Sequence, residues 1–347
     1  MIKFIVKFGT LKMNPSFQIH KSDWFAFLHE SSDKYNVYVP VRYNNNIEYE
    51  IFQNEIENIA LNIARPVTPL KTFFLPVKEN VVIDTSIHNK NIIIGVPSCD
   101  LHALDLLDKI YLDERFIDKS YKINRENSIL IGTDCFEIHE NCHCISYDIN
   151  PYPEINHDLS VVSVNGEIII SVNTDKGETL FNELKNSYTV KEAEKDKLDE
   201  IMTKRRETIN VLKKNNKSLP DYQKTGELIQ KSRDELWERY SRTCVSCGAC
   251  TTICPTCTCF LLIDRPDFEK VRQIDACQYP GFERIAAGED PLKNKYMRFR
   301  NRYLCKYIWK PEQFNSKACT GCGRCIDSCI GNINKNEIFI EMAGDGS

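Results

Sequence analysis

The sequence lacks the features that would place the protein in a membrane or on nucleic acid. No apolar run approaches the roughly twenty residues that a membrane-spanning helix requires. Its 45 basic and 49 acidic residues nearly balance, with a formal net charge of −4 and a pI near 6.0. Such a charge balance provides no electrostatic reason to expect nucleic-acid binding. We therefore expect neither a membrane nor a nucleic acid among the partners.

A secretory signal is also missing. The opening stretch, residues 1–8, is too short and too charged for a signal peptide. Met1 and Met13 are both candidate starts. We therefore expect a cytoplasmic protein, in which reducing conditions keep its sixteen cysteines out of disulfides.

Two further absences limit the kinds of metal and cofactor site that this chain can form. All seven histidines lie at or before His157, so the second half of the chain offers no mixed Cys/His zinc site. No Gly-x-Gly-x-x-Gly motif follows a strand-like run, which is where a dinucleotide site would begin. A nicotinamide or flavin cofactor is therefore expected on a partner and not on this chain.

Regularly spaced cysteines are the dominant feature of the C-terminal part. Two runs share the gaps of two, two and three residues, and Gly248 lets the first run curl tightly. This is the ferredoxin spacing, in which three thiolates bind one [4Fe–4S] cluster and the fourth binds the other. We therefore predict two [4Fe–4S] clusters with crossed ligation: Cys244, Cys247, Cys250 and Cys329 on one, and Cys319, Cys322, Cys325 and Cys254 on the other.

Two other interpretations of these runs compete with the cluster interpretation. Cysteines two residues apart in a tight loop are poorly placed to form disulfides with one another. A zinc-stabilised scaffold without a redox role is the alternative from another functional class. A structural zinc site needs only two pairs of cysteines, so it leaves half of the regular pattern unexplained.

A strand–glycine–cysteine pattern occurs twice in the N-terminal part, at residues 91–100 and 129–135. A helix-like stretch at 101–112 separates the two, so we predict a βαβ unit with parallel strands. Ligand sites form at the carboxyl ends of such strands. Together with a nearby loop, this edge predicts a third [4Fe–4S] cluster on Cys99, Cys135, Cys142 and Cys144. Zinc at these four positions, and cysteines that merely pack in the core, remain alternatives.

The hydrophobic patterns predict an α/β N-terminal domain followed by a mainly α-helical two-cluster ferredoxin domain. We place the α/β domain at 13–186, a charged helical connector at 187–240 and the ferredoxin domain at 241–347. Strands are expected at 35–42 and 47–52, with a hairpin at 161–172 that turns at Asn165-Gly166 and closes the domain. Helices are expected at 17–30, 191–214, 226–240 and 290–311, the last capped by Asp290 and stopped by Pro311.

The remaining cysteines and several arginines have weaker signals. We expect Cys257 and Cys259 to pack against a cluster, and Cys305 to lie off the apolar stripe of its helix. Cys257, Cys259 and Cys277 are weak candidates for a fourth metal site. Histidines near the cysteines, such as His102, His139 and His143, are expected to form hydrogen bonds and not to ligate a metal. Arg242, Arg298, Arg300 and Arg324 are expected on the surface as single charges, with a role in raising a cluster potential or docking a partner as the alternative.

The cysteine-rich segments together resemble a known family. The stretch 244–260 is similar to the iron–sulfur electron-transfer subunit of anaerobic, dissimilatory-type sulfite reductases, as are Ser98-Cys99-Asp100, residues 140–144 and the Ala276-Cys277 segment. The beta chain of cytoplasmic sulfhydrogenases is similar across the same motifs. The resemblance extends from about Met13 to Cys329. One departure is Ile330, which stands where a proline usually follows the last cysteine.

This resemblance implies a non-catalytic iron–sulfur subunit of an oxidoreductase complex. In the anaerobic sulfite reductase version, it passes electrons from a partner that binds FAD and NADH to a sirohaem-containing partner that reduces sulfite to sulfide. In the sulfhydrogenase version, it serves a cytoplasmic NAD(P)-linked hydrogenase. In neither version does this chain bind sulfite or NADH itself.

Overall fold

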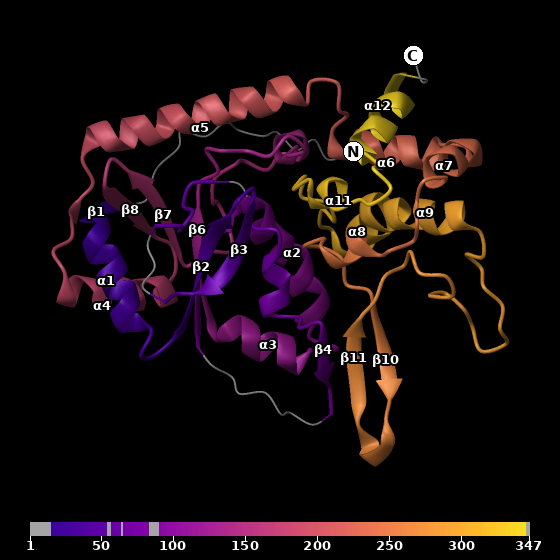
Figure 1. Ribbon diagram of the computed structural model, residues 1–347, viewed down its shortest axis with the longest axis horizontal. Helices are drawn as coiled ribbons and strands as arrows, with labels where there is room; N and C mark the ends of the chain where they lie inside the picture. The colour runs from indigo at the N-terminus through magenta and orange to yellow at the C-terminus, as the bar shows by residue number, and fades with distance from the viewer. Residues whose placement is uncertain (1–14, 54–56, 64, 83–89, 345–347) are drawn as a thin grey trace.

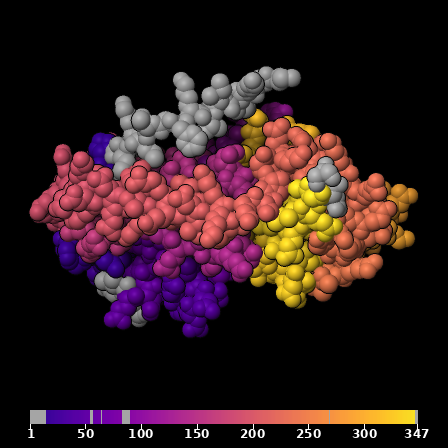
Figure 2. Space-filling view, turned by 90° about the horizontal axis from the view of Figure 1, so that it is seen from above, coloured from indigo at the N-terminus to yellow at the C-terminus, as the bar shows by residue number. Residues whose placement is uncertain are grey.

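The computed structural model describes residues 15–53, 57–63, 65–82 and 90–344. The candidate start at Met13 lies outside these residues. Two regions stand side by side: a sheet region formed by the first half of the chain and a helical region formed by the second half (Figure 1). Helix α5, Lys195–Asn215, runs across the surface between them (Figures 1 and 2). No helix in the described part of the chain is both long and apolar enough to cross a membrane.

The sheet region is built on one eight-stranded mixed sheet in the order β3-β2-β5-β6-β7-β8-β1-β9. Its strands are β1 Ser16–His20, β2 Asn36–Tyr43, β3 Asn46–Ile51, β5 Asn91–Pro97, β6 Ser128–Thr133, β7 Leu159–Val164, β8 Glu167–Val172 and β9 Lys191–Glu192. The central strands β2, β5, β6 and β7 are parallel, and the outer pairs are antiparallel. The predicted parallel βαβ unit is therefore confirmed.

Helices cover both faces of this sheet. On one face, α1 (Lys21–Ser31) and α4 (Asp175–Ser187) pack against a core that includes Ile92 and Ile94. On the other face, α2 (Ser98–Tyr111) and α3 (Lys119–Glu126) pack against a core that includes Ile93. Because successive strand residues point to opposite faces, a strand covered on both sides must be apolar along its buried length, as β5 is from Ile92 to Pro97.

Several boundaries in the sheet region differ from the sequence-based expectation. The helix expected at 17–30 begins only at Lys21, because Phe17 and Ile19 pair with Ile170 and Ile168 of β8. Helix α2 begins at Ser98 and not at 101. The Asn165-Gly166 turn is confirmed, but it does not close the region, since α4 follows it and packs on the sheet.

Gly95 does not end the strand that precedes Cys99. It lies inside β5 at a bulge between Ile94 and Val96, with φ of +74°. A Cβ there would come within 2.5 Å of the Pro40 side chain. The strand therefore continues past the glycine to Pro97, and the first helical turn of α2 follows directly.

The helical region has an aromatic core. Its helices are α6 Tyr222–Lys231, α7 Asp234–Ser241, α8 Ala249–Thr252, α9 Lys295–Leu304, a π-helical segment Cys305–Trp309, α10 Lys310–Phe314, α11 Arg324–Asp327 and α12 Lys335–Gly344. Trp237, Phe299, Tyr303, Tyr307 and Phe339 are buried together between these helices. The helix expected at 226–240 is two helices, because Ser232 and Arg233 are extended.

The helix expected at 290–311 is shifted. Asp290 accepts a hydrogen bond from the Leu292 amide in a turn, and α9 starts at Lys295. The chain remains helical past Pro311 to Phe314, because proline is tolerated in the first turn of α10. The stripe predicted along this helix is confirmed, since Phe299, Tyr303 and Tyr307 are buried.

A small second sheet and several ion pairs, one of them fully buried, join the two regions. The hairpin of β10 (Phe260–Asp264) and β11 (Lys270–Ile274) is completed by β4 (Lys78–Asn80), which comes from the first half of the chain (Figure 1). Arg324 donates to both oxygens of Asp100, at 2.6 and 2.7 Å, with both side chains at 0% exposure. The second region is therefore not purely helical, and the two regions share a buried contact.

Candidate metal centres

Three cavities are each lined by a different set of four among the twelve cysteines that the sequence singled out, and two of these cysteines also line a neighbouring cavity. Site 1 is lined by Cys244, Cys247, Cys250 and Cys329. Site 2 is lined by Cys254, Cys319, Cys322 and Cys325. Site 3 is lined by Cys99, Cys135, Cys142 and Cys144. Cys254 lines the cavity of the second run and Cys329 that of the first, and crossed ligation stays a prediction.

The two ferredoxin-like runs reach this arrangement through the same local conformation. Gly248 and Gly323 both have φ of +75°, and each begins a one-turn helix, α8 or α11. A glycine adopts this left-handed conformation without the steric cost that other residues incur. Each turn places the first three cysteines of its run around one cavity and sends the fourth to the other cavity.

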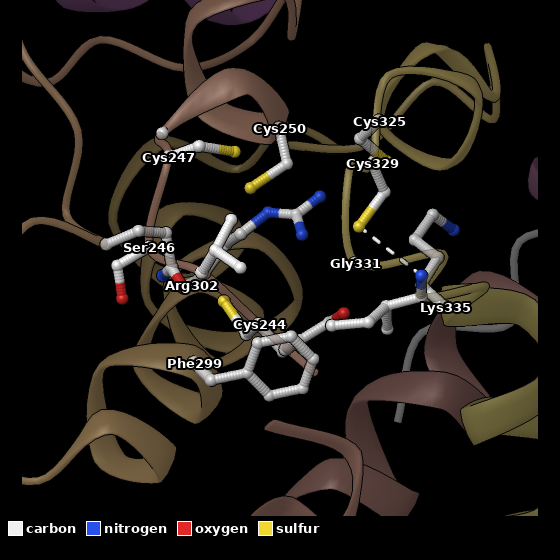
Figure 3. Close-up of a pocket in the computed structure, with 15 residues that line it drawn as sticks. Cys244, Ser246, Cys247, Cys250, Phe299, Arg302, Cys325, Cys329, Gly331 and Lys335 are labelled. Carbon is white, nitrogen blue, oxygen red and sulfur yellow. Dashed lines mark hydrogen bonds between the residues drawn. The ribbon is translucent and has the colours of Figure 1, made fainter. Parts of the chain in front are cut away.

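Figure 3 shows site 1 with the Arg302 guanidinium pointing into the cavity beside Cys250. Arg302 comes from α9 and is 5% exposed. The Ile333 amide donates a hydrogen bond of 3.3 Å to the Cys329 sulfur. Burial raises the pKa of Cys250 to about 11, so its thiolate requires a nearby positive charge.

Site 2 contains a direct contact between a cation and a sulfur. Lys306 donates from Nζ to the Cys254 sulfur at 3.0 Å and to Thr256 Oγ1 at 3.0 Å. A hydrogen bond from Cys257, together with the charges of Lys306 and Lys71, holds the pKa of Cys254 well below its usual range. Cys254 is therefore poised to be a thiolate, which is the form that binds iron.

Site 3 is assembled from several elements. Cys99 lies in the first turn of α2, Cys135 follows the end of β6, and Cys142 and Cys144 lie in the loop beyond it. The Cys135 amide donates to the Pro151 carbonyl at 2.8 Å, and Asn216 donates to the Cys142 carbonyl at 2.9 Å. Burial raises the pKa of Cys144 to about 12, and those of Cys99 and Cys135 well above the usual range.

The three sites form a row with shared walls. Cys325, Arg302 and Lys335 line both site 1 and site 2. Cys322 lines both site 2 and site 3. Site 2 therefore lies between the other two.

The residues around these sites fit [4Fe–4S] clusters. Among the described residues, no carboxylate pairs with Lys306 or Arg302, although both are buried beside cysteine sulfurs. A buried cation is costly unless an anion compensates it. An iron–sulfur cluster held by four thiolates is such an anion, so the buried cations are consistent with clusters in these cavities.

The other cysteines lie close by but do not form a fourth centre. Cys257 contacts Cys254, and Cys259 contacts Cys277, whose sulfur also receives a hydrogen bond from Gln278 at 3.7 Å. Cys305 lies in the π-helical segment. Within the described ranges, no three His, Cys, Asp or Glu side chains are grouped so as to hold a single metal ion.

Some of the histidines and arginines near the cysteines lie where the sequence predicted, and others do not. His143 is buried and hydrogen-bonds to the Asn141 carbonyl and to Lys335, as expected for a hydrogen-bonding neighbour. Arg242 is exposed, as expected for a surface charge. Arg298 and Arg324 are buried, so the surface expectation is wrong for both, because their guanidinium groups donate to backbone carbonyls or to Asp100.

Sequence reasoning missed Arg302 and Lys306. They are four residues apart on one helix, each directly before a residue of the buried aromatic stripe. The sequence did contain a signal for these two residues: each is a positive charge directly beside a buried aromatic residue. A position next to a buried stripe is often itself partly covered. Only the tertiary structure shows that their charged ends lie beside cysteine sulfurs.

Comparisons with known proteins agree with this geometry. Residues 243–333 match a family model described as a 4Fe-4S dicluster domain. Over 338 residues, the chain is 28% identical to the beta subunit of sulfhydrogenase 2 of Pyrococcus furiosus, with 94% of this chain and 97% of that protein covered. The match includes the sheet region and is not limited to the cysteine-rich segment.

Proposed function

We propose that this chain is an iron–sulfur electron-transfer subunit of a multisubunit oxidoreductase. The observation that carries the proposal is the row of three cavities, each lined by four or five cysteines and sharing a wall with its neighbour. The dicluster-domain match at 243–333 supports the same function. When bound, [4Fe–4S] clusters supply carriers that take up and release one electron at a time.

The residues of the chain hold these carriers close together. On this proposal, the eight cysteines of runs 244–254 and 319–329 bind two clusters with crossed ligation, and Cys99, Cys135, Cys142 and Cys144 bind a third. Buried aromatic side chains, including Tyr303 and Tyr307, line sites 1 and 2, while the exposed Cys247 leaves site 1 in contact with solvent. The low dielectric that the aromatic side chains create strengthens the effect of every nearby charge on the clusters.

The division of the chain into domains is part of the proposal. We assign residues 13–186 to an α/β domain, 187–240 to a helical connector and 241–347 to the ferredoxin domain. Helices α6 and α7 pack into the same aromatic core as α9 and α12, so the C-terminal half of the connector packs as part of the ferredoxin domain.

Two complexes are candidates for the assembly. The 28% identity to a sulfhydrogenase beta chain over nearly the whole sequence favours a hydrogenase-type complex. The motif Cys254-Pro-Thr-Cys257-Thr-Cys259 instead resembles the iron–sulfur component of anaerobic sulfite reductase, with partners that carry FAD and sirohaem. In both cases the chain alone is expected to reduce neither sulfite nor NAD.

Anaerobic purification tests the function and separates the candidates. The chain should be brown and contain iron and acid-labile sulfide in equal amounts, at about twelve of each per chain. A colourless protein that contains zinc contradicts the proposal and favours the scaffold alternative. Isolation of the native complex then decides between the partners, because nickel identifies a hydrogenase and sirohaem identifies a sulfite reductase.

A further inference from the structure

We propose that Lys306 makes site 2 the most easily reduced of the three sites, so that an electron entering the row from either end comes to rest in the middle. The inference deepens the proposed function and depends on it. Lys306 projects from the π-helical segment Cys305–Trp309 and is 5% exposed. Its partners are the Cys254 sulfur, Thr256 Oγ1 and the Ala318 carbonyl. The cysteine sulfur is the one partner among them that can carry a negative charge.

The cations near site 3 are balanced differently. Arg324 lies between Cys99 and Cys322, but it is paired with Asp100. Arg65 lines site 3 and is paired with Asp327. Each positive charge beside site 3 is therefore offset by a carboxylate of this chain.

Site 1 has weaker contacts with cations than site 2. It shares Arg302 and Lys335 with site 2, so these two charges favour both sites. Lys295, which is only half-buried, donates to the Cys244 carbonyl beside site 1 at 3.1 Å.

At site 1, the Cys329 sulfur accepts a hydrogen bond from the backbone amide of Ile333, which is neutral. At site 2, the donor is an ammonium group at 3.0 Å, and Lys71 is buried against the same loop through the Cys257 carbonyl.

These differences act on the reduction potential. Reduction adds a negative charge to a cluster, so a buried cation stabilises the reduced form more than the oxidised form. A hydrogen bond to a ligand sulfur acts in the same direction. Both effects are strongest at site 2, where one group supplies them together. The ends of the row are then left at lower potentials, suitable for exchange with partners.

The test is a reductive titration of the anaerobic protein, followed by electron paramagnetic resonance. In Lys306→Met, the midpoint potential of the first cluster to be reduced should become more negative, and the other two should keep their values. Lys310→Met is the matched control. Lys310 donates to the Thr256 carbonyl and to Thr258 Oγ1 in the same loop and not to a sulfur, so its loss should shift the first midpoint by less than the loss of Lys306 does and should leave the other two unchanged.

Two further arms make the result decisive. If Lys306→Met does not load its iron, Lys306→Gln removes the charge while retaining a hydrogen-bond donor, and a smaller shift in the same direction is expected. Independently of any lysine variant, Cys319→Ser should alter the signal that appears first in the unmodified protein. Unchanged midpoints in a fully loaded Lys306 variant overturn the inference, as does a first signal that Cys319→Ser leaves intact. A chain that lacks iron altogether refutes the proposed function instead.

Discussion

Sites 1 and 2 differ from site 3 in how their cysteines are brought together. The thiols of sites 1 and 2 come from two short runs, 244–254 and 319–329, each folded around a glycine with positive φ. Those of site 3 come from the end of β5, the end of β6 and a loop. A local motif forms its site through nearby backbone turns, whereas site 3 exists only when the sheet and the helical region have both folded. Site 3 should therefore be the more sensitive to changes elsewhere in the fold.

The contact between the two regions explains this sensitivity. Cys322 of the second run lines the wall of site 3, and the His143 amide donates to the Gly321 carbonyl at 2.8 Å. The buried Arg324–Asp100 pair lies beside the same wall. The ferredoxin-like loop thus supports site 3 from one side, while the sheet edge supplies its thiols from the other.

The largest expected effect separates the two kinds of site by iron content. Cys135→Ser should remove about four of about twelve iron atoms per chain and leave sites 1 and 2 loaded. Cys319→Ser is the counterpart that removes a ligand of site 2. Iron analysis with electron paramagnetic resonance measures both variants. If Cys135→Ser retains all of its iron, the four N-terminal cysteines are packing residues and the comparison between the sites fails.

A smaller effect is expected when the buried ion pair between the regions is broken. Asp100→Asn leaves the Arg324 charge buried without its carboxylate, a change that costs roughly 3–5 kcal/mol. The thermal unfolding midpoint should fall, and site 3 should lose iron before sites 1 and 2.

Asp113→Asn, just beyond the same helix, is the control. Asp113 pairs with Arg115 on the surface, where such pairs contribute little to stability. If both variants melt at the same temperature, the buried pair does not hold the regions together.

The smallest expected effect comes from one methyl group. In Gly321→Ala, the new Cβ would lie 2.6 Å from the Cys144 backbone, and φ at this position is +68°. Relief of the clash should cost about 1–3 kcal/mol and should loosen site 3 together with site 2. Gly288→Ala has a similar φ of +82° but meets no atom within 4 Å, so it isolates the clash from the backbone strain. Chemical denaturation of the two variants measures the difference, and equal stabilities contradict a tight wall between the regions.

Much of the fold could be predicted because its signals are local. The apolar strands at 91–97 and 128–133, the Asn165-Gly166 turn and the aromatic stripe of α9 all follow from residue periodicity. The errors occur where a partner overrides local preference. Phe17 and Ile19 fit a helical pattern, but pairing with β8 makes them a strand. Pro311 favours a helix stop, but it is accommodated at the start of a new helical turn.

By itself, the sequence determined which cysteines are candidate ligands, because the spacing within each run dictates which thiols one tight loop can present. It also determined that two glycine–cysteine strands would end at the same sheet edge. Only the tertiary structure decided that the three sites form a row, that Lys306 meets the Cys254 sulfur and that Arg324 is buried against Asp100. These contacts join residues far apart in the chain. A buried charge needs a partner of opposite charge, and the sequence alone does not show which distant group will be that partner.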